Sequence, residues 1–412
     1  MKKYKLGEIA DFNVKAISKS DSLQEIIYLD TSSITENVIS DTIIINIEDA
    51  PSRAQRRVKN NTIIYSTVRP RLKHYGILNN PQTNFIVSTG FVTIDLKEQY
   101  KQIIDPRYLY LLLTQSTITE YIGNIADTAV SAYPSINPAD ISSLSFNFPS
   151  FDLQKSVADI WENYDKKIVL NRQINQNLEA MAKQLYDYWF VQFDFPNEEG
   201  KPYKSSGGEM VWNDKLKRNI PVGWHCGNLS EIAVFTNGLA CQKFRPKADE
   251  VPLPVIKIRE MHDGISIDTE EVTSNIPESV KVYNGDVLFS WSASLEVMLW
   301  AYGLGGLNQH IFKVTSANDF PKSFYYFQLL DYVDVFKKMA EARKTTMGHI
   351  TQDHLQQSTI AIPDNKDIAD KFEELISPIF KQVVKLQEEI SNLIKQRDEL
   401  LPLLMNGQIT IE

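Results

Sequence analysis

Cysteine is nearly missing from this chain of 412 residues, in which only Cys226 and Cys241 occur. The pair lacks the CxxC spacing of redox and zinc motifs, so we expect neither a disulfide framework nor a four-ligand zinc site. The histidines show no HExxH or other metal-ligand spacing either. The sequence therefore predicts two reduced thiols and no metal site.

Long apolar runs are also missing. No stretch approaches the roughly 18 apolar residues that a membrane-spanning helix needs. The opening MKKYKLGEIADFN contains lysines but no apolar segment of the kind found in signal peptides. With 43% apolar and 23% charged residues, the composition is that of an ordinary globular protein. We expect a cytoplasmic protein with no membrane partner.

Motifs for catalysis and cofactor binding are missing as well. The chain contains no GxxxxGK loop for the phosphates of ATP. It contains neither an Asn-Pro-Pro-aromatic motif nor a glycine-rich strand-turn pattern for S-adenosylmethionine and base methylation. We find no acid pair and no set of nucleophile and base. The sequence predicts no catalytic residues and no cofactor in this chain.

An excess of positive charge is missing too. The formal net charge is −9, which argues against a simple nucleic-acid binder, because such domains are usually basic. The acidic residues are spread along the chain, whereas several lysines and arginines are clustered. The distribution of charge is therefore more informative than its total.

What the chain does contain is an internal repeat with a spacing of about 215 residues. LGEIADF at 6–12 is echoed by LSEIAVF at 229–235, and NNTIIYS ending at Ser66 by NGDVLFS ending at Ser290. Further on, PSINPADISSLSFNFP at 134–149 corresponds to GHITQDHLQQSTIAIP at 348–363. Each copy then leads into a long helical pattern, so the repeat indicates two similar domains.

The two helical segments carry apolar seams with alternating steps of four and three residues, which is typical of a coiled coil. At 1.5 Å per residue each helix would span about 60 Å. We expect the helices to pair antiparallel, with Asn171 and Asn175 fixing the register; two independent surface helices are the alternative. Pro378 should disturb the second helix, and the extra four-residue step from Ile379 to Val383 indicates a stutter. The predicted seams are Val157, Trp161, Tyr164, Ile168, Asn171, Asn175, Leu178, Ala182, Leu185 and Trp189, then Ile368, Phe372, Leu375, Ile379, Val383, Leu386, Ile390, Leu393 and Leu400, with Arg397 between the last two.

The predicted fold class is α+β. Short β-rich runs such as NTIIYSTV and GDVLFSW mix with helical runs such as DPRYLYLLLTQSTITEYIG in both halves. Antiparallel helices would relate the halves by an approximate two-fold axis. The predicted order is a globular domain at 1–150, a long helix at 151–195, a linker at 196–221, a second globular domain at 222–363 and a second long helix at 364–412.

Two similar domains joined by long helices suit a bipartite linear target, and DNA is the candidate. Arginine can bridge guanine O6 and N7, and both basic side chains neutralise phosphates. The clusters SRAQRRVKNN and VRPRLKHYG, which we place on loops bordering strands, and QKFRPK provide such groups. Each cluster alone is a weak signal, and solvated surface charge is the alternative interpretation of each residue. The candidate DNA-binding residues are Arg53, Arg56, Arg57, Lys59, Arg69, Arg71, Lys73, His74, Lys243, Arg245, Lys247, Lys257 and Arg259.

Further candidates lie in the second half. FSWSASLEVMLWAYGLGGLNQHIF contains Trp291, Asn308 and Gln309, and side-chain amides suit adenine edges. A tight turn explains the same residues. EARKTTMGHI adds Arg343 and Lys344, whereas its counterpart ADTAVSAYPSI has no basic residue. The two halves therefore need not read the same sequence.

Aromatic residues crowd the end of the first helix, in KQLYDYWFVQFDFP. Interface hot spots are enriched in such residues, so the segment is a candidate docking surface for a partner. Internal packing at the junction with the second domain is the alternative. The candidate docking residues are Tyr186, Tyr188, Trp189 and Phe190.

Taken together, the chain resembles the specificity subunit of type I restriction-modification systems over essentially its whole length. The resemblance rests on the duplicated layout, GDVLFSW followed by GLNQHIFKV, TTMGHIT, KQLYDYWFVQFDFP with IPVGW, and the ending RDELLPLLMNGQI. It implies two target-recognition domains, each reading one part of a split asymmetric site in double-stranded DNA. The long helices would act as a spacer.

The resemblance also implies partners. Two methyltransferase subunits would bind S-adenosylmethionine and methylate adenines, and restriction subunits would use ATP and Mg²⁺; this chain would remain non-catalytic. Two other classes stay open. A self-sufficient methyltransferase or nuclease would need a constellation that we do not find, and a coiled-coil scaffold unrelated to DNA would leave the duplicated basic loops without a purpose.

Overall fold

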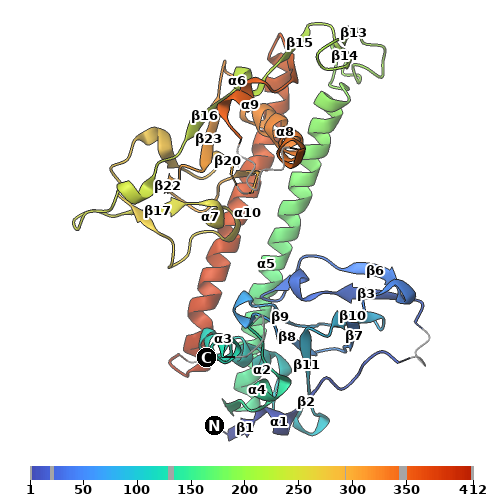
Figure 1. Cartoon of the computed structure of the whole chain (residues 1–412), viewed down its shortest axis with the longest axis vertical. Helices are drawn as coiled ribbons and strands as arrows, with labels where there is room; N and C mark the ends of the chain where they lie inside the picture. The colour runs from blue at the N-terminus through green and yellow to red at the C-terminus, as the bar shows by residue number, and fades with distance from the viewer. Residues whose placement is uncertain (1, 19–22, 129–133, 293, 343–349, 410–412) are drawn as a thin grey trace. The chain divides into compact units, whose positions relative to one another are not determined.

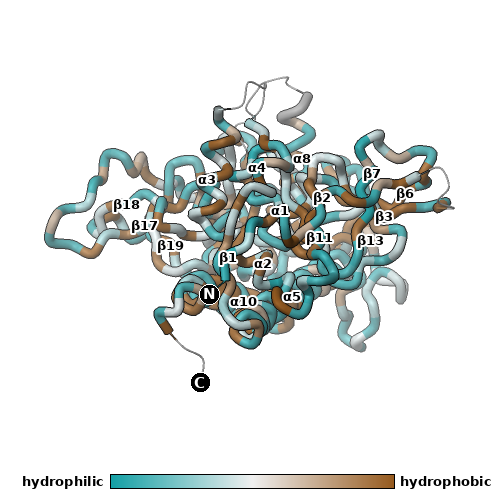
Figure 2. Tube along the Cα trace, turned by 90° about the horizontal axis from the view of Figure 1, so that it is seen from below, coloured by the Kyte–Doolittle hydropathy of each residue, from teal (hydrophilic) through white to brown (hydrophobic). Residues whose placement is uncertain are grey.

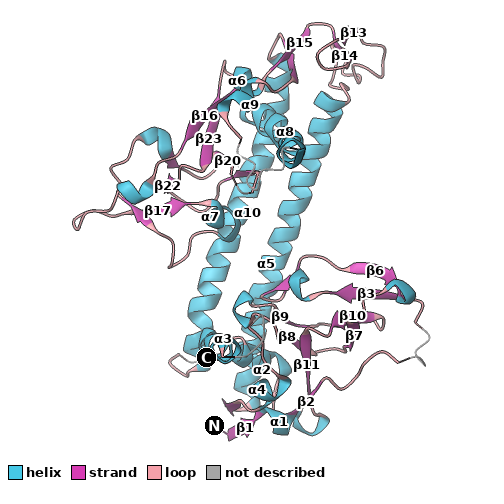
Figure 3. Cartoon of the chain, in the orientation of Figure 1, coloured by secondary structure: helices cyan, strands magenta, loops and turns pink. Residues whose placement is uncertain are grey.

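The computed structural model describes residues 2–18, 23–128, 134–292, 294–342 and 350–409. The chain divides into two compact units, one formed by Met1–Val169 with Arg397–Glu412 and the other by Leu170–Gln396. Each unit therefore contains part of both long helices, α5 (Phe151–Tyr186) and α10 (Asp367–Met405). Figure 1 colours these elements along the chain, and Figure 3 separates helices from strands.

The first unit contains two four-stranded sheets and two strand pairs, one of which is the short pair of β4 (Ile34–Thr35) and β5 (Val38–Ile39). In one sheet the order is β2-β11-β8-β9, in the other β6-β3-β10-β7, and β1 pairs with β12. Only β3 and β10 are paired in parallel among these strands. The other strands are β1 Lys2–Lys5, β2 Ala10–Phe12, β3 Glu25–Leu29, β6 Ile43–Asn46, β7 Ala54–Arg57, β8 Ile63–Ser66, β9 Tyr75–Ile77, β10 Phe85–Ser88, β11 Phe91–Leu96 and β12 Ser145–Phe148.

Local sequence explains where helix α2 of this unit begins. The Asp105 side chain caps α2 by accepting from the backbone N–H of Arg107, and Pro106 takes the first helical position. The helices are α1 Leu6–Ile9, α2 Pro106–Leu113, α3 Ser116–Asp127 and α4 Pro138–Ser142, and Pro70–Leu72 forms the 3-10 turn η3. Strand β11 is buried at every position, as expected for a central strand. Figure 2 shows the hydropathy of each residue along the chain.

The second unit repeats this topology. Its sheets have the orders β16-β23-β20-β21 and β18-β17-β22-β19, β15 pairs with β24, and β17 with β22 forms the corresponding parallel pair. The strands are β15 Trp224–Gly227, β16 Ala233–Asn237, β17 Leu253–Ile256, β18 Glu271–Val272, β19 Lys281–Val282, β20 Val287–Ser290, β21 Glu296–Leu299, β22 Gly305–Leu307, β23 Ile311–Ser316 and β24 Ile360–Pro363. The helices are α6 Leu229–Ile232, α7 Ile258–Asp263, α8 Lys322–Ala342 and α9 Gln352–Gln356. The predicted duplicated α+β fold is confirmed.

The two long helices pack together as predicted, and their contacts in the second unit show that they run antiparallel. Asn175 of α5 donates to the main-chain carbonyl of Val383, whereas Tyr186, farther along α5, packs its ring against Phe372, which lies earlier on α10. Helix α10 is helical without interruption across Pro378, so the expected local disturbance does not break the helix.

The seam of α10 differs from the prediction at its start. Leu375 is 49% exposed, whereas its neighbour Ile376 is fully buried. Phe380 is likewise buried, while the predicted Ile379 is only partly buried. The one-residue shift arises because the aromatic core of the second unit faces Phe372, Ile376 and Phe380, so burial there follows this core. From Val383 to Leu393 the predicted positions are buried as expected.

The aromatic segment after α5 forms the centre of the second unit. The chain leaves α5 through a short π-helical turn, Asp187–Val191, and Phe193 is fully buried with a positive φ of 64°. Phe190 contacts the rings of Phe324 and Phe372, each at a centroid distance of 5.0 Å. Such ring pairs add to the stability that burial alone provides.

The predicted linker at 196–221 is an ordered part of the second unit. It contains the hairpin of β13 (Met210–Asn213) and β14 (Arg218–Pro221). The guanidinium of Arg218 lies 4.4 Å from the centroid of the Phe193 ring and donates to the Val191 carbonyl. These contacts attach the hairpin to the end of the aromatic segment.

Candidate nucleic-acid interface

The first basic cluster gathers around strand β7. Arg56 and Arg57 lie within this strand rather than on a loop, and Arg53 and Lys59 flank it. Arg53 forms an ion pair with Asp30 at 3.1 Å, but its side chain remains 59% exposed. Because the main chain of Arg57 donates to the Lys15 carbonyl at 2.9 Å, the exposed Lys15 joins this cluster. Sequence reasoning missed Lys15, because only main-chain contacts between distant segments place it beside β7.

Arg56 stands out in this cluster. Its side chain is half-buried, and burial lowers the pKa of its guanidinium. Its buried Nε has no hydrogen-bond partner among the described residues. A cationic donor without an acceptor is costly. The site therefore favours an additional acceptor, such as a phosphate oxygen.

The second basic cluster is largely used inside the first unit. Arg71 donates to Asp127 at 2.6 Å, to Asn124 at 2.7 Å and to Glu120 at 3.3 Å, all on α3. These carboxylates, Asp127 first, raise the pKa of Arg71. The guanidinium also covers Gly123, where an added Cβ would lie 2.8 Å from it. Arg71 thus joins η3 to α3 instead of extending from the surface.

The neighbours of Arg71 vary in their availability. Lys73 pairs with Glu36 at 2.5 Å, and His74 Nδ1 lies 2.6 Å from the Ile34 carbonyl. Arg69 is exposed, with a positive φ of 48° at the start of η3. Of the four predicted residues around this turn, Arg69, Arg71 and Lys73 are exposed, and His74 is partly buried.

In the second unit the basic groups lie on the loop between β16 and β17. Lys243, Arg245 and Lys247 are all exposed there. Lys257 pairs with Glu270 at 2.5 Å, and Arg259 donates to Glu260 at 2.7 Å. The loop residues are therefore better placed to meet phosphates than the last two. Arg343 and Lys344 lie outside the described residues.

The predicted polar residues of the second half meet at the ends of β16, β20 and β23. Trp291 Nε1 donates to Asn237 Oδ1 at 3.2 Å, and the Trp291 ring lies 5.6 Å from that of His310. Asn308 is only 7% exposed and donates to Gln309 Oε1 at 3.1 Å. Asn308 therefore builds the turn, as the alternative interpretation held, whereas Gln309 and His310 are accessible.

The candidate docking aromatics are mostly internal. Tyr186, Trp189 and Phe190 belong to the core of the second unit, whereas Tyr188 is 37% exposed. Tyr188 is therefore the member of this set that can contact a partner without rearrangement.

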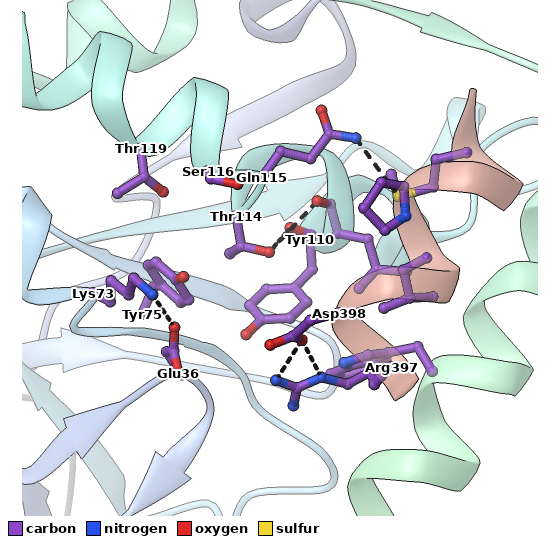
Figure 4. A pocket seen from close by; sticks show the side chains of 15 residues that line it. Glu36, Lys73, Tyr75, Tyr110, Thr114, Gln115, Ser116, Thr119, Arg397 and Asp398 are labelled. Atoms are coloured by element: carbon purple, nitrogen blue, oxygen red, sulfur yellow. Dashed lines mark hydrogen bonds and ion pairs between the residues drawn. The ribbon is translucent and has the colours of Figure 1, made fainter. Parts of the chain in front are cut away.

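A polar pocket of about 230 Å³ lies in the first unit among α2, α3, β9 and the end of α10 (Figure 4). Tyr75 and Tyr110 form part of its wall. Arg397 Nε donates to Asp398 at 2.8 Å, and Lys73 pairs with Glu36. The basic residues that line the pocket are each paired with a carboxylate, so we assign no charged ligand to it.

Within the described residues, no group of three or more His, Cys, Asp or Glu side chains could hold a metal ion. No helix among them is long and apolar enough to cross a membrane.

Comparison with known proteins adds independent evidence. Residues 1–180 and 221–396 match the family model of the type I restriction modification DNA specificity domain. The chain is 26% identical to the type I restriction enzyme HindI specificity subunit of Haemophilus influenzae, over 99% of each chain. It is 25% identical to the MjaIX specificity subunit of Methanocaldococcus jannaschii, over 89% of this chain and 82% of that one.

One solved structure shows the same fold. The crystal structure of a type I restriction-modification system S subunit from M. genitalium superposes with a TM-score of 0.56, covering 98% of this chain and 95% of the other. Their sequences are only 14% identical. The architecture of two β-rich domains and two long helices is therefore shared although few residues are.

Proposed function

We propose, given that this chain belongs to the type I restriction-modification DNA specificity family, that its two units read the two parts of one asymmetric site in double-stranded DNA. As a specificity subunit it is the non-catalytic component of a type I enzyme, and the S-adenosylmethionine and ATP chemistry belongs to partner subunits. The residues of this chain bind and position DNA for that chemistry.

The observation that carries the proposal is one topology that bears two different sets of polar groups. Both units have the same pair of four-stranded sheets. In the first unit the basic groups Arg53, Arg56 and Arg57 lie on and beside β7, whereas in the second unit Lys243 and Arg245 lie on the loop after β16. Equal scaffolds with unequal surfaces suit a target whose two parts differ in sequence.

The long helices are proposed to set the length between the two parts of the site. The buried seam makes α5 and α10 mutually dependent, because Asn175 and Val383 fix one register between them. A fixed register gives a fixed spacing. DNA sites with a longer or shorter gap would then place one part out of reach.

The partners of this chain are proposed to be two methyltransferase subunits and, in the restriction complex, the motor-nuclease subunits. Tyr188 is a candidate contact for a methyltransferase, since it is exposed in the π-helical turn that follows α5. Because the net charge of this chain is −9, the partner subunits are proposed to contribute many of the phosphate contacts. Methylation of a base also requires that it leaves the stack, which is the task of the catalytic subunit.

The test is to co-express the chain with its cognate methyltransferase, weigh the complex by native mass spectrometry and map methylated adenines in the host DNA. We expect a complex of two methyltransferases with one specificity chain and a split methylated motif with a fixed gap. A chain that forms no complex and directs no methylation would contradict the proposal and favour a scaffold role.

A further inference from the structure

The end of the sheet β16-β23-β20 is closed by a small frame of hydrogen bonds. The main chain of Trp291 donates to the His310 carbonyl at 3.3 Å, and the main chain of Ile350 donates to the Trp291 carbonyl at 3.1 Å. The His310 N–H donates to the Asn308 side chain at 3.3 Å. This frame holds the loop between β22 and β23 against the loop after β20.

The first unit contains the same frame. The main chain of Thr67 donates to the Gly90 carbonyl at 2.9 Å, and the main chain of Ile136 donates to the Thr67 carbonyl at 2.9 Å. The Gly90 N–H donates to the Ser88 side chain at 3.3 Å. Each bond has its counterpart in the second unit, so the two loop ends are equivalent by geometry.

Strand register supports the equivalence. Ser66 pairs with Phe91 where β8 meets β11, and Ser290 pairs with Ile311 where β20 meets β23. The residues just beyond these pairs therefore occupy corresponding places in the two units.

The frame is shared, but the side chains that it presents are not. The polar side chains that close the frame, Ser88 and Asn308, are both buried. The three positions that each frame presents are all at least partly accessible to solvent. These positions are Thr67, Thr89 and Gly90 in the first unit and Trp291, Gln309 and His310 in the second.

We infer that these three positions of each unit determine which base pairs it reads, and that Gln309 reads an adenine in the second part of the site. The inference rests on the proposed function and assigns residues within it. A backbone frame that both units share, with different and accessible side chains, allows one scaffold to read two sequences, because base readout needs fixed side-chain origins and different donor and acceptor groups.

The amide of Gln309 is held in place yet keeps bonding capacity. Its Oε1 accepts from Asn308 Nδ2 at 3.1 Å, and its Nε2 lies 3.3 Å from His310 Nε2. Because an amide nitrogen only donates, the second contact is a hydrogen bond when His310 carries its proton on Nδ1, which lies 3.4 Å from Ser292 Oγ. One oxygen lone pair and one N–H of Gln309 remain, which match the N6 donor and N7 acceptor of adenine.

Trp291 and the first unit show how the presented surface changes. The Trp291 indole is fixed by Asn237. It gives the second unit a flat apolar wall, with its ring 5.6 Å from that of His310. In the first unit the Thr67 hydroxyl donates to the Gly90 carbonyl at 2.9 Å, and Gly90 adds no side chain. The Thr89 N–H donates to the Arg53 carbonyl at 2.8 Å, which places an arginine next to the first loop end.

The experiment replaces Gln309 in the complex with the methyltransferase and maps adenine methylation across the host DNA. With Gln309→Thr we expect methylation of the original sites to fall at least tenfold relative to sites that differ at one A·T pair of the second part. The first part of the motif and the gap should stay unchanged. Gln357→Thr, an exposed glutamine on the turn after α9, is the matched control and should leave the motif unchanged.

A second variant tests the equivalence of the frames. Thr89→Gln in the first unit should alter base preference in the first part of the motif only. An unchanged motif in both variants, in complexes that assemble and melt like the wild type, would overturn the assignment of these positions. A wild-type complex that methylates no split motif would instead show that the proposed function itself is wrong.

Discussion

The side-chain amide of Asn175 on α5 donates to the main-chain carbonyl of Val383 on α10 at 3.2 Å. This hydrogen bond crosses the buried seam between the two helices where they run through the second unit. The Oδ1 of Asn175 accepts no hydrogen bond from any described residue, although the atom is buried. An unpaired buried acceptor costs free energy. In coiled coils a polar seam residue lowers the stability but selects one register between the helices.

Replacing Asn175 by leucine is expected to stabilise the chain. The variant removes the unpaired Oδ1 and adds apolar contact with the seam, which should raise the free energy of unfolding by about 1–2 kcal/mol. Urea denaturation followed by circular dichroism measures the change. A lower midpoint at unchanged slope would mean that the bond to Val383 outweighs the unpaired atom.

Arg107 is expected to be a main electrostatic link in the first unit. It bonds the buried Asp105 and, on α5, Asp159 and Glu162, at 2.6–2.7 Å. Arg107→Met should lower the free energy of unfolding by about 2 kcal/mol, since a buried carboxylate loses its partner. The exposed pair of Lys101 and Glu98 supplies the control, and Lys101→Met should leave the melting curve nearly unchanged.

The same network predicts a dependence on pH. Hydrogen bonds from Lys166 and then Arg107 lower the pKa of Glu162 below its ordinary value of 4.5. The resulting stabilisation is present above pH 4.5 and is lost as the pH falls through the folded-state pKa. Melting temperatures measured between about pH 6 and 3 should fall less steeply in Arg107→Met than in the wild type. Parallel curves would show that Arg107 does not act on this carboxyl.

Shortening both long helices by one heptad is expected to change the gap and nothing else. Seven residues correspond to about 10 Å of helix, or roughly three base pairs of DNA. Methylation mapping should therefore reveal the same two half-sites separated by about three base pairs fewer. An unchanged gap would refute the role of the helices as a spacer.

The exposed loop residues Lys243, Arg245 and Lys247 are expected to contact phosphates. Replacing all three by alanine should reduce the slope of log affinity against log salt by up to about 2.7, at roughly 0.9 for each lost phosphate contact. Fluorescence anisotropy of the methyltransferase complex on duplex DNA at several salt concentrations measures this slope. A loss of affinity confined to the specific sequence would instead assign these residues to base readout.

Arg71 and Arg69 are expected to have different roles, Arg71 in stabilising the first unit and Arg69 in recognising DNA. Because its guanidinium is engaged by three side chains of α3, Arg71→Ala should lower the melting temperature without changing the methylated motif. Arg69→Ala, on the exposed start of the same turn, should weaken recognition of the first half-site. A motif altered by Arg71→Ala at unchanged melting temperature would reverse the two assignments.

The sequence by itself determined the duplication, the α+β class and most of the helix seam. These features are periodic or repeated, so they are visible in the order of residues: Val157, Ile168 and Ala182 follow one helix face whatever they contact. The match of LGEIADF with LSEIAVF likewise indicates two equivalent segments without knowledge of their neighbours, and the structure shows α1 and α6 there.

Only the tertiary structure decided which residues are available. The order of residues does not show that Arg71 is bound by side chains some 50 positions later, or that Ile376 replaces Leu375 because an aromatic core faces it. It also does not show that a main-chain hydrogen bond brings Lys15 to β7. The shared frame at Thr67 and Trp291 is likewise made of hydrogen bonds between distant segments. Periodicity fixes which face of an element is apolar, whereas long-range packing fixes which polar groups are used up inside the fold and which remain for DNA.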